Sequence, residues 1–346
     1  MTDRILVTGS NGMLGGALVR RLAADGHKVR GLDLRATPGS HEMEECFVGD
    51  VRDESLMTKA VAGADAVVHC AAALPSYPDE QIRSVIVSGT RNVLEAAYRA
   101  DVPRVVQISS TAVYGLPKLV PTPESHPRSP VDVYSGAKAS AEEVGEEFRD
   151  RGQCLSILRP KTFLGPGRLG LFAMLFEWAD EGRNFPVLGR GDVRIQMLDI
   201  EDLVDAVVLA LRGPEHRVSG TFNIGAERFG TLREDFQAVL DAAGHGKRIV
   251  SLPAKPALTA LSMLQRARLS PVYGRLLHKL LADSYVSVDL AREQLGFRPQ
   301  RSNQDAILRT FAWWREGREA NQARGSGATS KDAWRQGALA LTKAFF

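Results

Sequence analysis

Short apolar runs alternate with longer segments of helical periodicity through the first half of the chain. The apolar runs predict strands at Arg4–Thr8, Lys28–Leu32, Ala66–Cys70, Arg104–Ser109 and Leu155–Leu158. The segments between them repeat apolar positions every three or four residues and predict helices at Met13–Ala24, Ser55–Val61, Ile82–Arg99 and Tyr134–Arg149. Strand and helix in alternation are typical of a parallel sheet covered by helices on both faces, so we expect a doubly wound α/β fold.

The pattern changes after Pro160, where the turn-rich stretch "FLGPGRLG" begins. Further helices are predicted at Leu171–Ala179, Asp202–Leu211 and Pro253–Pro271. We expect a first domain over residues 1–165, to which later segments return, and a smaller mixed α/β lobe over residues 166–315.

Residues 316–346 form a separate tail in this interpretation. The stretch "REGREANQARGSGATSKD" is polar and predicts a linker. A short amphipathic helix follows, whose apolar side chains are Trp334, Leu339, Leu341, Phe345 and Phe346. We expect this helix to dock on its own body or on a neighbouring subunit, with contact to a membrane surface as the alternative.

Composition places the chain among ordinary globular proteins, with 44% hydrophobic and 25% charged residues and a net charge of +3. No basic stripe alternates with aromatic residues, which argues against a nucleic-acid partner. Neither a leader nor an apolar run of ~20 residues is visible, so we expect a cytoplasmic protein without integral membrane association. Cys46, Cys70 and Cys154 are far apart and are interpreted as buried free thiols, with no metal site.

The stretch "TGSNGMLGG" places Gly9, Gly12 and Gly15 between the first strand and the first helix. Glycines there let the backbone turn tightly and approach a pyrophosphate, whose charge meets the N–H groups at the helix start. Asp33 ends the next strand, where a carboxylate accepts hydrogen bonds from the adenosine ribose. This acid favours NAD over NADP, although the nearby Arg35 weakens the preference. The alternative is that the glycines form only a tight connection.

Other strand ends fit the same dinucleotide site. Asp50, in "GDVRD", is placed to bind the adenine amino group, with Val51 against the adenine ring. The small residues 71–73 of "VHCAAA" allow the backbone to pass close to the cofactor. His69 is interpreted as a packed histidine at a strand end and not as a catalyst.

Tyr134 and Lys138 are four residues apart and therefore share one helical face. A tyrosine with its usual pKa of about 10 is a poor base at neutral pH. A lysine ammonium and a positively charged nicotinamide nearby favour the phenolate, and lowering the pKa by about three units takes roughly 4 kcal/mol. The upstream stretch "QISSTAVYG" offers the hydroxyls of Ser109, Ser110 and Thr111 to bind a substrate oxygen.

Together with "HCAA", "LRPKTFLGPG", "FNIG" and "LGFRP", these motifs resemble the extended short-chain dehydrogenase/reductase family over residues 3–300. The resemblance is nearest to its NAD-dependent epimerase/dehydratase group, and it implies a Rossmann-type sheet. It also implies that Tyr134 is the acid/base, that Lys138 holds the nicotinamide ribose and tunes the tyrosine, and that Ser110 binds the reacting oxygen. The expected NAD contacts are Gly9, Asn11, Gly12, Met13, Leu14, Gly15, Asp33, Leu34, Asp50, Val51, Cys70, Ala71, Ala72, Tyr134, Lys138 and Pro160.

Departures from the family pattern narrow the reaction. Family dehydratases carry an Asp-Glu pair directly after the catalytic hydroxyl, and the related decarboxylases carry Glu at the second of these positions. This chain has Thr111 and Ala112, so it resembles the epimerases more closely. Arg194 stands where family members bind a nucleotide phosphate, with a solvated surface arginine as the alternative.

Three other departures weaken the likeness to sugar-nucleotide enzymes. Residues 86–90, "IVSGT", lack the asparagine of the usual N-V-x-G-T motif. Thr162 replaces an asparagine that often contacts the diphosphate. The loop that usually ends H-V-x-D has the sequence "LDIED" at residues 198–202.

The function expected first is an NAD-dependent sugar-nucleotide epimerase, similar to UDP-glucose 4-epimerases, that transfers a hydride transiently to bound NAD with Tyr134 as acid/base. Its expected substrate contacts are Ser110, Thr111, Thr162 and Arg194. The alternative is an NAD(P)-dependent dehydrogenase or reductase of a hydroxy or keto group on a lipid, a steroid-like or another small molecule. The apolar residues 257–281 and Thr162 favour it. A non-catalytic, dinucleotide-sensing protein is the third possibility.

The resemblance also implies a homodimer, because the family dimerises through the helices that correspond to residues 82–99 and 134–149. Both predicted helices carry more apolar residues than one buried face needs.

Overall fold

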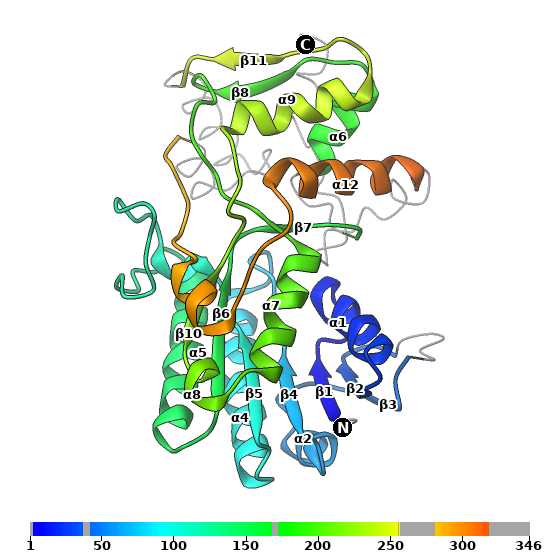
Figure 1. Cartoon of the computed structure of the whole chain (residues 1–346), viewed down its shortest axis with the longest axis vertical. Helices are drawn as coiled ribbons and strands as arrows, with labels where there is room; N and C mark the ends of the chain where they lie inside the picture. Colours follow the sequence, from blue (N-terminus) through cyan, green and yellow to red (C-terminus); the bar gives the residue numbers. More distant parts are fainter. Residues whose placement is uncertain (1–2, 37–41, 168–171, 255, 257–280, 318–346) are drawn as a thin grey trace.

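The computed structural model describes residues 3–36, 42–167, 172–254, 256 and 281–317. Its larger lobe is built on a seven-stranded parallel sheet, and a smaller lobe lies beyond the carboxyl ends of the strands (Figure 1). The strands lie in the order β3 (Glu45–Val48), β2 (Lys28–Asp33), β1 (Arg4–Thr8), β4 (Ala66–His69), β5 (Arg104–Ile108), β6 (Leu155–Pro160) and β10 (Thr221–Ile224). The strand order reverses between β1 and β4, and ligands of such sheets bind at the crevice beside that point. The predicted α/β fold of Rossmann type is confirmed.

Helices cover both faces of this sheet. One face carries α1 (Met13–Ala24) and α7 (Ile200–Arg212), and the other carries α2 (Glu54–Val61), α4 (Gly89–Arg99) and α5 (Val133–Asp150). Within β1, Ile5 and Val7 pack toward α1 while Leu6 packs toward α2 and α4. Strands buried on both faces are apolar at every position, which is why the sequence pattern identified them.

The ends of the observed elements and two short strands, β10 and β3, differ from the prediction made from the sequence. The four-residue β10 was not predicted, because so short a run has no clear period. β3 is the edge strand and is largely exposed. The prediction that all three cysteines are buried is therefore wrong for Cys46, which is exposed on β3, whereas Cys154 is buried.

The predicted helix at residues 82–99 begins earlier than expected and contains a π-helical turn. It runs from α3 (Asp79–Arg83) through η1 (Ser84–Ser88) into α4. The hydroxyl of Thr90, in the first turn of α4, donates to the carbonyl of Ile86 in the π turn at 2.6 Å. A π turn changes the side of the helix on which the following residues lie, and such turns are frequent at functional sites.

The smaller lobe packs an aromatic core between helices and a short sheet. It contains α6 (Phe172–Asp180), α9 (Leu232–Ala243), α12 (Asn303–Glu316) and the parallel strands β8 (Phe185–Leu188) and β11 (Ile249–Leu252). The rings of its core are those of Phe176, Trp178, Phe185, Phe236, Phe311 and Trp314. Most of the predicted helix at residues 253–271, and residues 318–346 of the predicted tail, lie outside the described residues.

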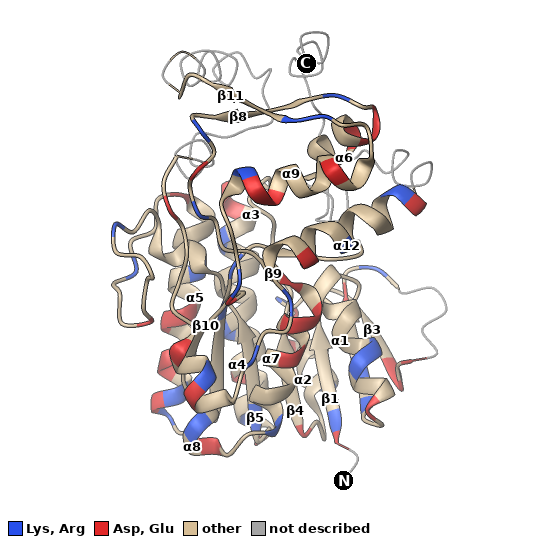
Figure 2. Cartoon of the chain, turned by 45° about the horizontal axis from the view of Figure 1, so that its top comes forward, with Lys and Arg blue, Asp and Glu red and all other residues tan. Residues whose placement is uncertain are grey.

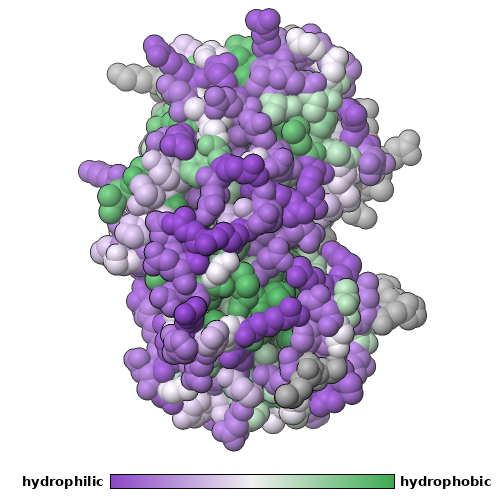
Figure 3. All heavy atoms as spheres, in the orientation of Figure 1, coloured by the Kyte–Doolittle hydropathy of each residue, from purple (hydrophilic) through white to green (hydrophobic). Residues whose placement is uncertain are grey.

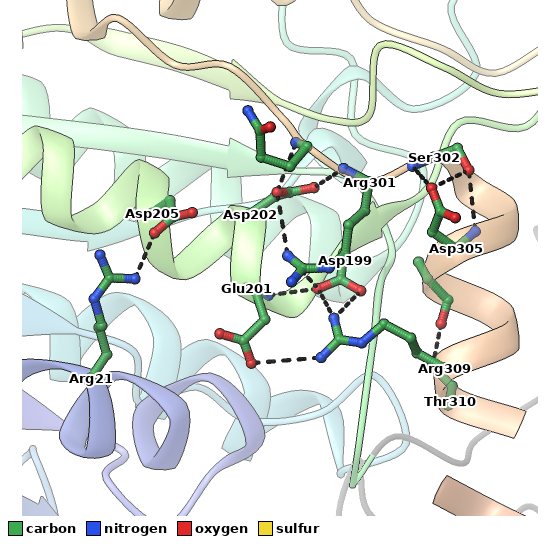
Figure 4. Close-up of polar contacts among 12 residues, drawn as sticks. Arg21, Asp199, Glu201, Asp202, Asp205, Arg301, Ser302, Asp305, Arg309 and Thr310 are labelled. Carbon is green, nitrogen blue, oxygen red and sulfur yellow. Dashed lines mark hydrogen bonds and ion pairs between the residues drawn. The ribbon is translucent and has the colours of Figure 1, made fainter. Parts of the chain in front are cut away.

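Ion pairs fasten the smaller lobe to the sheet (Figure 4). Asp199 ends β9 (Leu198–Asp199), is fully buried, and accepts the backbone N–H of Glu201 at the start of α7. Arg309 of α12 donates to both carboxylate oxygens of Asp199 at 2.7 Å. Asp202 accepts the backbone N–H groups of Gln300 and Arg301. The start of α7 is therefore the point at which the two lobes are joined.

Charge is distributed along the helices that flank this joint. Acidic residues of α7 lie beside basic residues of α1 (Figure 2), and Arg21 pairs with Asp205 at 2.7 Å. The surface between the lobes is mainly hydrophilic in the view of Figure 3, with hydrophobic atoms gathered just below that band. In the described ranges no helix has both the length and the apolar composition that a membrane span requires.

Candidate active site

The glycine turn is shaped by close backbone approach. Gly9 has a φ of +69°, and a Cβ placed there would lie 2.8 Å from the backbone nitrogen of Ala71. A Cβ at Gly15 would fall on the carbonyl oxygen of Gly9. Helix α1 begins after Gly12, and no described side chain caps its first N–H groups. The turn therefore presents unoccupied N–H donors at a helix start, which is an arrangement that binds phosphate.

Asp33 is fixed beside this turn by backbone donors. Its Oδ2 accepts the N–H of Asn11 at 3.0 Å, and its Oδ1 accepts the N–H of Arg35 at 3.4 Å. The Asn11 side chain donates to the Arg35 carbonyl at 2.6 Å, and Leu34 is exposed next to it. Because each carboxylate oxygen has a further lone pair, Asp33 can also accept hydrogen bonds from two ribose hydroxyls.

The two residues expected at the adenine, Asp50 and Val51, have different surroundings. Asp50 is paired with Arg52 at 2.6 Å, and this hydrogen bond lowers the pKa of the Asp50 carboxyl. Arg52 also donates to the Ser84 hydroxyl of η1 at 3.0 Å. The Val51 side chain is only 5% exposed and packs close to Gly89 of α4. Asp50 is thus partly exposed and paired with its arginine, while Val51 belongs to the hydrophobic core.

His69 is a buried, neutral link beneath the crevice. Since the Thr90 hydroxyl donates to Ile86, we assign the Nε2–H of His69 as donor to Thr90 at 3.1 Å and its Nδ1 as acceptor from Thr8 at 2.8 Å. Burial lowers the pKa of His69 to about 3. The interpretation of His69 as a packed strand-end histidine is confirmed.

The small residues after β4 lie between the glycine turn and Lys138. The Ala71 N–H is 3.4 Å from the Thr8 hydroxyl, next to Gly9. Ala72 is exposed, and the half-buried Cys70 lies near the Lys138 ammonium. Burial raises the pKa of the Cys70 thiol to about 12, so the thiol is uncharged at neutral pH.

Helix α5 carries Tyr134 and Lys138 to the end of β5. Asp132 caps the helix by accepting the N–H of Ser135 at 2.7 Å. The Lys138 ammonium is 7% exposed and donates to the carbonyl of Ile108 at 2.8 Å. Burial lowers the pKa of Lys138 to about 8. Tyr134 is half-buried and packs against the face formed by α3 and η1.

The three hydroxyls after β5 have different environments. Ser109 is 4% exposed and donates to a carboxylate of α5, that of Glu142. Ser110 is partly exposed and accepts the N–H of Ala112 at 3.1 Å. The Thr111 hydroxyl is 3.3 Å from the carbonyl of Pro160 at the end of β6. Of the three hydroxyls, that of Ser110 has no acceptor for its proton among the described residues, and its side chain is partly exposed.

Arg194, from the segment between β8 and β9, is exposed and lies against two aromatic rings that contact each other. Its guanidinium carbon lies 4.9 Å from the ring centre of Phe229 and 5.2 Å from that of Tyr285. A guanidinium that packs against aromatic rings on one side keeps N–H groups available on the other side, where they can bind a phosphate anion. Its backbone is held by Asp283, which accepts the Arg194 N–H at 2.8 Å.

The end of β6 is joined to Arg194 through Ser284. Thr162, two residues after β6, is exposed. Its neighbour Lys161 donates to the Ser284 carbonyl at 2.8 Å and approaches the Ser284 hydroxyl at 3.0 Å. The Ser284 N–H in turn donates to the Arg194 carbonyl at 2.8 Å. The structure thus connects the end of β6 with the segment that carries Arg194.

Sequence reasoning missed several residues that shape this crevice. Glu142 lies four residues after Lys138, so the series of i, i+4 and i+8 positions could have identified it. Arg159, Phe229 and Tyr285 gave no local signal, because their partners are remote in the sequence. Among the described residues, no three His, Cys, Asp or Glu side chains form a group that could hold a metal ion.

Comparison with known proteins agrees with this architecture. Residues 5–225 match the model of the NAD dependent epimerase/dehydratase family. The chain is 30% identical to a UDP-glucose 4-epimerase of Mycolicibacterium smegmatis, over 90% of this chain and 98% of that protein. It is 28% identical to a 3 beta-hydroxysteroid dehydrogenase/Delta 5-->4-isomerase of Mycobacterium tuberculosis, over 90% of each.

Among solved structures, the Bordetella bronchiseptica enzyme WbmG in complex with NAD superposes with a TM-score of 0.75. The two chains are 22% identical, and the match covers 97% of this chain and 98% of WbmG. This similarity extends over both lobes and supports the fold.

Proposed function

Because this chain belongs to the NAD dependent epimerase/dehydratase family and has NAD as its cofactor, we propose that it is a nucleotide-sugar epimerase similar to UDP-glucose 4-epimerases. The described residues fit the cofactor. The glycine turn leaves no room for a Cβ at Gly9 or Gly15, the start of α1 has no side-chain cap, and Asp33 is held where a ribose would lie. Bound there, NAD supplies a hydride acceptor that can return the hydride to either face of a sugar carbon.

The chain's own residues supply the proton transfer in this proposal. Tyr134 removes the proton of the sugar hydroxyl and returns it at the end of the cycle. The Lys138 ammonium, fixed on Ile108, stabilises the phenolate through its charge. Ser110 binds the same oxygen and keeps it within reach of the phenol. No net oxidation results, so the cofactor does not need to leave.

The observation that carries the nucleotide-sugar proposal is the exposed guanidinium of Arg194, which packs against the rings of Phe229 and Tyr285. The two rings lie on one side of it and limit its movement, and its N–H groups on the other side favour an anionic ligand such as a diphosphate. The similar M. smegmatis protein is named for an activity on UDP-glucose. Thr111 and Ala112, which lack carboxylates, favour epimerisation over elimination in the same site.

A second candidate is a dehydrogenase or reductase of a neutral hydroxy or keto compound. Thr162, in place of an asparagine, and the similarity to a steroid dehydrogenase favour it. The apolar residues 257–281, which also favoured this function, lie outside the described residues except for residue 281.

One assay separates the two functions. The protein is incubated with UDP-glucose, UDP-galactose or UDP-N-acetylglucosamine without added cofactor, and the sugars are separated by chromatography. An epimerase converts a sugar into its 4-epimer without a lasting change in NADH absorbance. A dehydrogenase leaves these sugars unchanged and produces NADH in proportion to an oxidised alcohol when NAD is added.

We also propose a homodimer through the outer surface of α4 and α5. A groove on this surface, between η1 and α5, is lined by the partly exposed Val87 and Val133 among polar and charged residues. Light scattering over a range of concentrations tests this proposal, and a monomer mass at every concentration would contradict it.

A further inference from the structure

A buried carboxylate lies directly behind the proposed catalytic residues. Glu142 is 0% exposed and follows Tyr134 and Lys138 at the next positions of the same face of α5. Its Oε1 accepts the Ser109 hydroxyl and, at 2.9 Å, the Nε–H of Arg159. Its Oε2 accepts a second Arg159 N–H at 2.6 Å. A carboxylate this deep is retained only where its charge is paired and hydrogen-bonded.

The network extends away from the crevice into the sheet. Arg159, on β6, donates to the Tyr114 hydroxyl at 2.7 Å, and Tyr114 donates to Asn223 of β10 at 2.8 Å. Arg128, from the loop before α5, reaches Glu142 at 3.4 Å. Arg159 already provides two donors to Glu142, so the charge of the carboxylate is compensated without Ser109. Charge compensation therefore does not explain the hydrogen bond that Ser109 donates to Glu142.

Two consecutive residues at the end of β5 are tied to two consecutive turns of α5. The Ile108 carbonyl accepts the Lys138 ammonium, and the Ser109 hydroxyl donates to Glu142. Ser110, which follows at once, is the proposed substrate-binding hydroxyl. These two bonds set the register between the strand end that presents Ser110 and the helix that presents Tyr134 and Lys138.

We propose that Ser109 and Glu142 are positioning residues, whose bond sets the distance between the Ser110 hydroxyl and the Tyr134 phenol. The inference rests on the proposed function, in which both groups bind the same substrate oxygen. A proton transfer requires heavy atoms about 2.6–3.2 Å apart, so a small shift of the strand end against the helix slows the reaction. Binding of NAD and of the distal part of the substrate depends mainly on other elements, the glycine turn with Asp33 and the segment of Arg194, and should change little.

The test compares Ser109→Ala with Ser156→Ala. Ser156, on β6, is also fully buried, and its hydroxyl donates to the Val218 carbonyl at 2.6 Å. Each substitution removes one buried hydroxyl donor, and the two variants should lose similar stability. A purely structural role for Ser109 therefore predicts the same kinetics for both.

The measured quantities are kcat and KM for UDP-glucose and UDP-galactose, the affinity for NAD, and the melting temperature. We expect Ser109→Ala to lower kcat about tenfold, equivalent to about 1.4 kcal/mol of transition-state free energy. KM and the affinity for NAD should stay within about twofold of the wild type, and Ser156→Ala should keep its kcat. Equal kcat values for the two alanine variants would overturn the proposal.

Glu142→Gln is a second variant that keeps the shape of the side chain and removes its charge. Provided that it melts as a folded protein, it should lower kcat at least as much as Ser109→Ala, again without a change in KM. A folded Glu142→Gln variant with the kcat of the wild type would contradict a positioning role.

A readout without substrate separates this inference from the proposed function. If the wild type converts none of the sugars, the epimerase proposal fails, but the positioning role can still be tested without substrate. The Tyr134 phenol is titrated in the protein as purified by following its near-ultraviolet absorbance. The signal of Tyr134 is the difference between the wild type or Ser109→Ala and the same protein with the additional change Tyr134→Phe. We expect a higher pKa for Tyr134 in Ser109→Ala than in the wild type, because Lys138 is less firmly placed.

The serine substitution leaves the charged group near Lys138 in place. The charged group is Glu142, while the Cys70 thiol and His69 remain neutral through burial. A Tyr134 pKa that is the same in Ser109→Ala and in the wild type would overturn the positioning role, whichever substrate the enzyme uses.

Discussion

The two lobes bring different kinds of groups to the crevice. On the sheet side, Lys138 and Glu142 are buried and bonded to the end of β5, and the glycine turn is fixed by backbone contacts. On the other side, Arg194 is exposed on a connecting segment and its guanidinium packs against two neighbouring rings. From this difference we infer that residues on rigid elements carry out the reaction, whereas an exposed, adjustable surface selects the substrate. This division is common where one fold serves many substrates. Substitutions on the two sides should therefore affect different kinetic constants.

The largest effect is expected from Tyr134→Phe on the rigid side. Loss of the phenolic hydroxyl removes the proposed acid/base, and kcat should fall about a thousandfold. The affinity for NAD, measured by tryptophan fluorescence or calorimetry, should change little. A variant with the kcat of the wild type would refute the catalytic assignment.

Gly15→Ala should produce the next largest effect, on cofactor binding. Its Cβ would meet the carbonyl oxygen of Gly9, and such overpacking costs about 1–3 kcal/mol. We expect the Kd for NAD to rise about a hundredfold, because the turn must move.

Gly16→Ala is the matched control, because a Cβ there meets its nearest neighbour at an ordinary 3.5 Å. It should bind NAD as the wild type does. Equal affinities in the two variants would mean that the cofactor does not depend on this turn.

Arg194→Gln tests the adjustable side and should raise KM for a UDP-sugar about thirtyfold while kcat stays within about threefold. The exposed Arg190 of the same lobe provides the control variant Arg190→Gln, with an expected KM close to that of the wild type. If Arg194→Gln lowered kcat and left KM unchanged, substrate binding and chemistry would not be divided between the lobes as proposed.

The smallest effect concerns the stability of the rigid side as the pH falls. His69 has a pKa of about 3 in the folded chain, against 6.5 for the free side chain. Below pH 6.5 the unfolded chain binds a proton that the folded chain does not, so this residue lowers stability as the pH falls toward 3. Its contribution is at most about 1.4 kcal/mol per pH unit.

The variant His69→Gln removes this titration. Urea unfolding at about pH 7 and about pH 5 should give a less steep loss of stability for the variant than for the wild type. Equal slopes would show that the His69 ring takes up a proton in the folded protein.

The sheet and the first half of the crevice could be predicted from sequence because their signals are local. Continuous apolar runs marked the buried strands, and the glycine spacing with Asp33 marked the turn. The pair of Tyr134 and Lys138 was visible because one helical turn separates them. By contrast, the π turn at residues 84–88 and the four-residue β10 have no distinct period.

The contacts that hold the site together could not be predicted, because they join distant parts of the chain. Arg159 on β6 meets Glu142 on α5, 17 residues earlier, and Arg194 meets Tyr285, from a segment about ninety residues later. The exposure of Cys46 also depended on tertiary structure, since only the strand order makes β3 an edge. Local patterns thus predicted the elements, while tertiary packing determined how the elements are fastened.

The most direct test of the central claim is to denature the protein as purified, without added cofactor, and to identify the nucleotide that is released. An epimerase that regenerates its cofactor in every cycle has no need to exchange it. The account therefore predicts close to one NAD per chain. A chain that releases no nucleotide and binds NAD only weakly would contradict it, because such a cofactor exchanges in every cycle, as in a net dehydrogenase.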